Sequence, residues 1–379
     1  MLVRLTEEQE EIRTLVAEFA GKVLAPSAAD RDEVEAIDTE LIQEMAEIGL
    51  MSIGIPEEYG GLGFGSTEKA IVVEEIAKKD AAVAELVSVH NMAYTAILKH
   101  GSDALKEHYL PIAAEGGVAA FALTEPQAGS DSSAVRTTAV ADGDDYIING
   151  SKCFISNFGP HEGAFVTLLA LTEPEKGTKG LTAFVVDRDN PGMKLGRREE
   201  KMGIRAADVS EIFLEDCRVS KDKIVGEPGK GFNYFMEALD AGRIGMAAQA
   251  IGLAEEAIDL SADYMKTRVQ FGKPIAKLQG LQWYLADMAT KTAAAKALVY
   301  QAAASLDRGE RATTEAAMAK YFASETAVAV VDKALQIHGG YGYMRDYPLE
   351  RMYRDVRIIP IYEGTSEIQK LIISRALLK

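Results

Sequence analysis

The spacing of hydrophobic residues changes twice along this chain of 379 residues, and that change restricts the folds available to it. Up to residue 117, apolar residues recur at the intervals of amphipathic helices. From Val118 to about Val225, short apolar segments alternate with glycine and proline, as β-strands do. Helical spacing then returns until the chain ends. We therefore predict a mainly α protein with a β insert: a helical domain over 1–117, a compact β barrel or sandwich over 118–225, and an antiparallel helix bundle over 226–379.

Local signals give the expected boundaries of the first helices. Thr6 and Gln9 have the spacing of a capping box, and Pro26 is expected to end the first helix. The stretch PEEYGGLGFGS could be a nucleotide-binding loop, but its glycines do not match G-x-G-x-x-G in register. We interpret it as a sharp turn between two helices.

In the middle and last thirds, other residues mark turns and helix ends. Asn149-Gly150 between two apolar segments predicts a β-hairpin turn there. Gly339 and Gly340 are expected to close the third of four long alanine-rich helices. Thr365 or Ser366 is expected to cap the last helix.

Composition limits the classes of function. The formal net charge of −17 argues against nucleic acid as a partner, although local cations could still bind a small anion. Two cysteines and five histidines show no disulfide or zinc spacing, so we expect no metal. The opening residues lack the apolar core of a signal peptide, and no apolar run approaches the ~18 residues of a membrane span. We expect a soluble, cytoplasmic protein.

One carboxylate has an unusual setting, in the stretch IYEGTSEIQ. Glu363 follows the apolar residues Ile358, Ile359 and Ile361 and precedes Gly364. If the apolar approach buries Glu363, its pKa rises toward the range of a general base. Alternatively, Glu363 is a surface residue near a helix start, where acidic residues are favoured. The residues alone leave both interpretations open.

Two further segments could bind oxygen-rich groups of a ligand. In FALTEPQAGSD, backbone N–H groups near Gly129 and Ser130 could do so, or the segment could be an ordinary connection. In RVQFGKP, Arg268 could bind a phosphate, or it could simply complement a helix C-terminus together with Lys273.

Along essentially its whole length, the sequence resembles the acyl-CoA dehydrogenase family, and most of all its short-chain, butyryl-CoA dehydrogenase branch. The motifs that carry the resemblance are FALTEPQAGSD, KCFISN, KMGIR, LDAGRIGMAAQ, RVQFGKP, LQIHGGYGY, ERMYRD and IYEGTSEIQ. The family fold has a helical N-terminal domain, a middle β-barrel domain and a C-terminal four-helix bundle, in agreement with the spacing of the hydrophobic residues.

The resemblance implies non-covalent FAD and assigns residues to it. Those expected along the flavin are Phe121, Leu123, Thr124, Gly129, Ser130, Phe154, Ile155 and Ser156, with Phe154 where tryptophan is commoner. Those expected to bind FAD across a subunit interface are Arg268, Phe271, Gln279, Gln336, Ile337, His338, Gly339 and Gly340. Thr365, Ser366 and Glu367 are expected to approach the cofactor. Those expected near the CoA thioester are Ser130, Asp240, Ala241, Gly242, Arg243 and Gly364.

The implied chemistry is α,β-dehydrogenation of a short-chain acyl-CoA. Glu363 would remove the α proton, the β hydride would pass to FAD, and an electron-transfer flavoprotein would take the electrons. Some branches carry the base just before the bundle arginine, but here that residue is Gly242, which strengthens the case for Glu363. The resemblance also implies a homotetramer, arranged as a dimer of dimers.

Three alternatives stay open at this point. The same chemistry could run backwards, as an enoyl-CoA reductase with the same flavoprotein. An oxygen-using oxidase is disfavoured because such relatives have a long C-terminal extension. A non-catalytic helical scaffold would be colourless and would take up no FAD. The floor of the acyl pocket is expected from the helix around Val83 to Thr95 and from residues near Tyr362.

Overall fold

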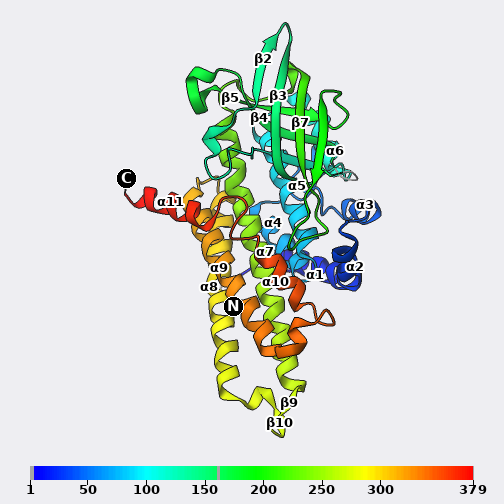
Figure 1. Ribbon diagram of the computed structural model, residues 1–379, viewed down its shortest axis with the longest axis vertical. Helices are drawn as coiled ribbons and strands as arrows, with labels where there is room; N and C mark the ends of the chain where they lie inside the picture. Colours follow the sequence, from blue (N-terminus) through cyan, green and yellow to red (C-terminus); the bar gives the residue numbers. More distant parts are fainter. Residues whose placement is uncertain (1–3, 160–162, 379) are drawn as a thin grey trace.

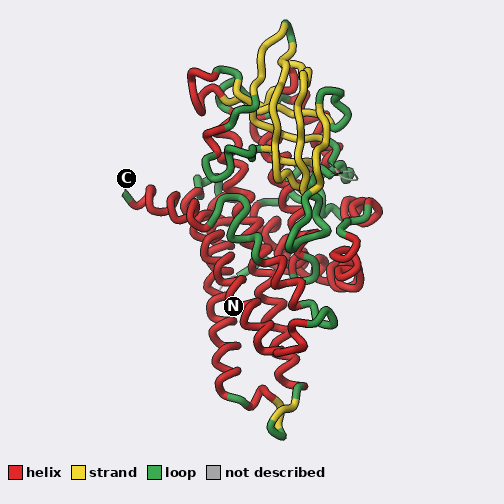
Figure 2. The backbone as a smooth tube through the Cα atoms, viewed as in Figure 1, coloured by secondary structure: helices red, strands yellow, loops and turns green. Residues whose placement is uncertain are grey.

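The computed structural model describes residues 4–159 and 163–378. They form an elongated molecule in which the large sheet lies at one end and helices make up the rest (Figures 1 and 2). This arrangement confirms the predicted class, a mainly helical protein with a β region in the middle of the sequence.

The N-terminal region is helical. Its helices are α1 (Glu7–Phe19), α2 (Ala25–Val34), α3 (Thr39–Glu47), α4 (Ser66–Ala77), α5 (Ala81–His100) and α6 (Asp103–Ala114). Among the described residues, α5 is the one helix long and apolar enough to cross a membrane, but 94% of its most apolar window is buried inside the protein. Such burial is typical of a core helix.

The start of the chain agrees with one prediction and contradicts another. Thr6 and Gln9 form the predicted capping box at the start of α1. Pro26, however, does not end the helix: a π-helical turn over Ala20–Leu24 connects α1 to α2, and Pro26 lies in the first turn of α2. The prediction was wrong because proline is tolerated in a first helical turn. The helical path ends only at Glu35, which has a left-handed backbone.

The glycine-rich stretch after α3 is a tight turn, as predicted. Gly60 and Gly63 have positive φ values of 86° and 67°. A Cβ at position 61 would lie 2.0 Å from the carbonyl oxygen of Ile55, so the backbone is folded closely on itself. The glycines therefore allow the chain to turn sharply between α3 and α4.

The β region is an eight-stranded sheet. Its strands are β1 (Ala119–Ala122), β2 (Thr138–Asp142), β3 (Asp145–Ser156), β4 (Phe165–Leu171), β5 (Leu181–Asp187), β6 (Met193–Arg198), β7 (Val209–Ser220) and β8 (Ile224–Val225). The strand order is β6-β7-β3-β2-β4-β5-β8, and β1 pairs in parallel with β4. Side chains such as Ile148, Phe184 and Ile212 form a core of their own on this sheet.

The hairpin turn is not at Asn149-Gly150, so that prediction was wrong. Strand β3 continues through both residues, and the turn joins Asp142 to Asp145, which are paired in register. The two turn residues are therefore Gly143 and Asp144, and Gly143 has a φ of 63°, as a hairpin turn with glycine at its first central position requires. Gly150 has another role: a Cβ there would lie 2.5 Å from Thr137 Oγ1, and the register of β3 against β7 shifts beside it.

The C-terminal region contains the longest helices. They are α7 (Gly231–Thr267), α8 (Gln279–Asp307) and α9 (Thr313–His338), followed by α10 (Leu349–Val356) and α11 (Ser366–Leu377). A short hairpin of β9 (Val269–Gln270) and β10 (Lys273–Pro274) joins α7 to α8 at the end of the molecule far from the sheet (Figure 1). Gly339, with a φ of 59°, closes α9 as predicted, and Thr365 is the cap of α11.

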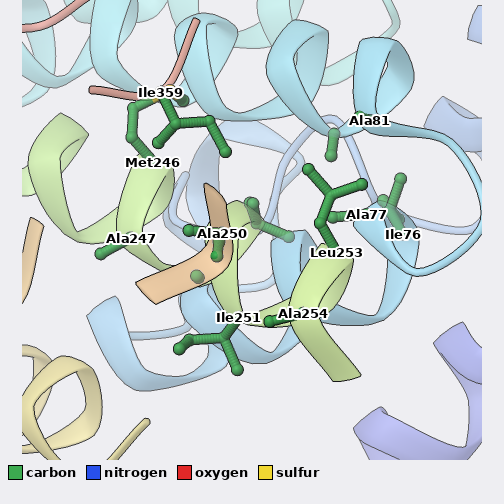
Figure 3. Packing of buried hydrophobic residues seen from close by; sticks show 14 of the residues in the cluster. Ile76, Ala77, Ala81, Met246, Ala247, Ala250, Ile251, Leu253, Ala254 and Ile359 are labelled. Atoms are coloured by element: carbon green, nitrogen blue, oxygen red, sulfur yellow. The ribbon is translucent and has the colours of Figure 1, made fainter. Parts of the chain in front are cut away.

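Small side chains allow α7 to approach the N-terminal helices closely. Ala247, Ala250 and Ala254 lie buried with residues of α4 and α5 (Figure 3). At Gly252 a Cβ would lie 2.2 Å from the carbonyl oxygen of Glu74 in α4. This close packing fixes α4, α5 and α7 relative to one another and so positions the residues described next.

Candidate active site

Glu363 lies in the turn between α10 and α11, and its carboxylate is buried. The residue has a φ of 51°, an uncommon value for a residue other than glycine. Both carboxylate oxygens are buried, and within the described part of the chain neither has a hydrogen-bond partner. Burial raises the pKa of Glu363 to about 7, although the positive charges of Lys320 and Arg243 lower it. The surface interpretation of this residue is therefore wrong.

Hydrogen bonds from three side chains hold this turn in place. Lys320 donates to the carbonyl oxygen of Gly364 at 2.8 Å. Gln369 donates to the carbonyl oxygens of Glu363 and Gly364 at 3.2 and 2.8 Å. The Tyr362 hydroxyl donates to Gln249 of α7. With these contacts, an uncommon backbone conformation can persist at Glu363.

Helices α5 and α7 form the wall against the carboxylate. A Cβ at Gly242 would lie 2.4 Å from Glu363 Oε2 and 2.6 Å from Met92 Sδ, so only glycine leaves room for both. The next residue of α7, Arg243, is buried and donates to Asp240 at 2.5 Å. Thr313 also donates to Asp240, at 2.5 Å. Thus the structure brings Glu363 together with the predicted residues Asp240 to Arg243.

The segment predicted along the flavin crosses from β1 to the end of β3. Phe121 is buried against Phe235, with ring centres 4.2 Å apart. Thr124 accepts a hydrogen bond from the backbone of Cys153 at 3.0 Å, which places Phe154 beside this segment. Leu123 is buried, whereas Gly129 and Ser130 lie in the exposed turn that follows.

Three successive residues of β3 have different surroundings. The Phe154 side chain is 65% exposed, and its φ is 57°. Ile155 is buried in the core of the sheet, so its side chain faces away from any ligand. Ser156 donates to Glu85 of α5 at 2.6 Å. Burial raises the pKa of Glu85 to about 7.

A second group of predicted residues forms a separate groove of about 540 Å³. Arg268, Phe271, Ile337, His338, Gly339 and Gly340 line it. The Arg268 guanidinium lies 5.2 Å from the centre of the Tyr341 ring, and the His338 ring stacks on Tyr264 at 4.1 Å. Gln279 and Gln336 are exposed at the ends of α8 and α9.

Within one chain the two groups are far apart. Gly242 lies in the first third of α7 and Arg268 is its C-cap, so 26 residues of helix, about 39 Å along the axis, separate them. Figure 1 shows the β9–β10 hairpin at the end of the molecule away from the sheet. The structure therefore does not bring Arg268 and Phe271 to Glu363.

The residues at the start of α11 make hydrogen bonds within the protein. Thr365 accepts from the backbone of Ile368, and Ser366 donates to Glu325 at 2.6 Å. Glu367 is exposed. The structure thus gives Thr365 and Ser366 a role in starting the helix beside Glu363.

Sequence reasoning missed several residues around Glu363. Lys320 is fully buried, and burial lowers the pKa of this lysine to about 8. It stands alone among Ala316, Ala317, Ala319 and Ala323, and a lone lysine in an alanine stripe is the signal that could have identified it. Met92 and Gln249 lie in apolar helices, and no spacing distinguishes them from ordinary core residues.

Three domain models of one known enzyme family match this chain. Models of the acyl-CoA dehydrogenase N-terminal, middle and C-terminal domains match residues 6–117, 120–217 and 229–378. Together they cover most of the chain, so the fold is that of a three-domain flavoenzyme. The chain belongs to the acyl-CoA dehydrogenase family and is an FAD-dependent oxidoreductase.

Individual relatives agree with this assignment. The acryloyl-CoA reductase (NADH) of Anaerotignum propionicum is 54% identical over 99% of this chain and 95% of its own length. Butyryl-CoA dehydrogenase of Megasphaera elsdenii has a TM-score of 0.97 at 41% identity, with 100% of both chains covered. A structure concerning the electron transferring flavoprotein of Acidaminococcus fermentans contains a chain with a TM-score of 0.97 and 45% identity, covering 99% of each. The predicted short-chain resemblance is confirmed.

Proposed function

We propose that this enzyme interconverts a short-chain acyl-CoA and its trans-2-enoyl-CoA, with Glu363 as the group that exchanges the α proton. The observation that carries the proposal is the buried carboxylate without a hydrogen-bond partner among the described residues. Because the pKa of Glu363 is about 7, this carboxylate can accept a proton and return it near neutral pH.

The residues predicted to contact FAD fit that cofactor. A Cβ at Gly129, Gly339 or Gly340 would meet nothing within 4 Å, so a ligand could approach the backbone there. Phe154 and Phe271 expose 65% and 90% of their surface, which suits contact with a flat aromatic ring system. When bound, FAD supplies the acceptor for the hydride that leaves the β carbon.

We further propose that a second copy of the chain completes each cofactor site. Arg268 and the exposed Phe271 lie about 39 Å of helix from Gly242, so one chain cannot supply both groups to one flavin. A homotetramer arranged as a dimer of dimers would place the Arg268 groove of one subunit beside the Glu363 site of another.

The residues of this chain would position the thioester. The backbone N–H of Glu363 would donate to the thioester carbonyl oxygen and so favour loss of the α proton. Gly242 lets the Glu363 carboxylate lie directly against α7, because any larger residue there would displace it. Lys320 and Arg243 stabilise the negative charge of Glu363 before it takes a proton.

The reverse reaction is a second candidate, and a specific observation favours it. A relative 54% identical to this chain is named acryloyl-CoA reductase (NADH). We propose that an electron-transfer flavoprotein in the cytoplasm is the electron partner in either direction, supported by the similarity to a chain from the Acidaminococcus structure. Crotonyl-CoA reduction driven by NADH with that flavoprotein, compared with butyryl-CoA oxidation, distinguishes the two directions.

The assignment of Glu363 is tested by Glu363→Gln. We expect the variant to bind FAD, seen in its absorbance, and to show no flavin bleaching in an anaerobic titration with butyryl-CoA. Glu40→Gln, which changes an exposed carboxylate in α3, serves as the control and should bleach normally. Bleaching of Glu363→Gln at a rate near that of the wild type would contradict the proposal.

A further inference from the structure

A second buried carboxylate, that of Glu85 in α5, has no part in the proton exchange proposed for Glu363. Only 1% of Glu85 is exposed. One of its oxygens accepts a hydrogen bond from the Ser156 hydroxyl at 2.6 Å, and the other is buried without a hydrogen-bond partner among the described residues. Burial of an acidic oxygen without a partner is costly, and acidic groups in such surroundings are most often found at functional sites.

Titratable groups from two other segments act on Glu85 or are affected by it. Burial raises the pKa of Glu85 to about 7; its hydrogen bond and the positive charge of Lys201 lower this pKa, and Asp208 raises it. The Lys201 ammonium donates to two backbone carbonyl oxygens and not to the carboxylate. In the turn after α10, burial and the charge of Glu85 both raise the pKa values of Tyr362 and Glu363. Glu85 is therefore partly ionised at neutral pH, and no ion pair neutralises it in the described part of the chain.

The end of β3 fixes Glu85 beside the segment proposed to contact FAD. Two successive residues of this strand end donate to α5: Ser156 to the Glu85 carboxylate, and the Asn157 amide to the carbonyl oxygen of Leu86 at 2.9 Å. Phe154, two residues before Ser156, exposes 65% of its surface. Glu85 thus lies directly behind Ser156, one of the residues proposed to lie along the flavin.

A negative charge in this position opposes reduction of a flavin. Reduction adds negative charge to the flavin ring system, and like charges repel more strongly in a protein interior than in water. Charged groups close to the ring system are one of the means by which a protein tunes a bound flavin. An ionised Glu85 would therefore make the oxidised flavin a weaker electron acceptor and the reduced flavin a stronger electron donor.

We propose that Glu85, held in place by Ser156, lowers the reduction potential of bound FAD and so favours electron transfer from the flavin to an enoyl-CoA. The inference rests on the proposed function, because it requires FAD beside Ser156, and it adds a residue that biases the direction of the reaction. Glu85 is a tuning residue: it acts on the flavin through its charge and does not exchange the α proton.

The test is the midpoint potential of the FAD-loaded enzyme without substrate, measured by anaerobic titration against a redox dye at a pH above the pKa of Glu85. Glu85→Gln removes the charge and keeps an oxygen that can accept from Ser156. We expect the equilibrium between reduced and oxidised flavin to shift about 10-fold toward the reduced form, which is a rise of about 30 mV for a two-electron couple. An unchanged or lower potential would overturn the proposal.

A second variant and a matched control assign the shift to the charge of Glu85. Glu85→Met, with a side chain of similar length and no charge, should raise the potential to a similar extent. Burial raises the pKa of Glu74 to about 7 as well, but Glu74 pairs with Lys296 of α8 at 2.6 Å, so Glu74→Gln should leave the potential unchanged. An equal rise in Glu74→Gln would contradict the proposal.

The dependence on pH gives a further check. Below the pKa of Glu85 the wild-type carboxyl is protonated and neutral, so the difference in potential between the wild type and Glu85→Gln should shrink as the pH falls through about 7. A difference that grows as the pH falls would be evidence against the tuning role. If the wild-type protein takes up no FAD, the proposed function itself fails.

Discussion

The contact between Gly242 and the Glu363 carboxylate makes Gly242→Ala a direct test of the site geometry. The new Cβ would lie 2.4 Å from Glu363 Oε2 and 2.6 Å from Met92 Sδ, whereas atoms in ordinary contact are about 3.5 Å apart. The carboxylate must therefore move by about 1 Å. A displacement of that size in a reacting group lowers the rate by about 100-fold. Alanine also favours the helix by about 1 kcal/mol, which opposes the effect of the clash on folding.

The assay is the rate of anaerobic flavin bleaching by butyryl-CoA in a stopped-flow instrument. We expect kcat/KM to fall about 100-fold while the FAD absorbance and the melting temperature stay close to those of the wild type. Gly21→Ala is the control, since a Cβ at that position would meet nothing within 4 Å. Wild-type bleaching by Gly242→Ala would refute the placement of the carboxylate against α7.

Two further predictions concern buried charges. Because deprotonated Glu363 is the base, flavin reduction by acyl-CoA should speed up as pH rises through about 7, the pKa of Glu363. Lys320→Met removes a charge that lowers this pKa, so the midpoint of the pH–rate profile should move up by about 1 unit, and a downward shift would be inconsistent with the geometry. Glu125→Ala leaves the fully buried Lys152 without its ion-pair partner at 2.7 Å, and urea unfolding should show a loss of about 3–5 kcal/mol.

The order of the regions could be predicted from the sequence because each depends on the local period of apolar residues. Individual boundaries depend on a choice between competing local signals. Asn149-Gly150 and Gly143-Asp144 both resemble hairpin turns, but Asn149 is paired with Thr138 inside the sheet, so only the second pair forms the turn. Pro26 likewise fits either a helix end or a first helical turn, and the neighbouring π-helical turn selected the latter.

The protonation state of Glu363 could not be predicted from its neighbours in sequence. The apolar residues before it suggested burial, but Met92, Gly242 and Lys320, which surround it, come from α5, α7 and α9. Burial raises the pKa of the carboxyl, while the charges of Lys320 and Arg243 lower it, and burial has the larger effect. Without these cations the carboxyl would hold its proton more tightly and would be a poorer base at neutral pH. The ability of Glu363 to act as a base near neutral pH therefore depends on the packing of three helices that are distant in sequence.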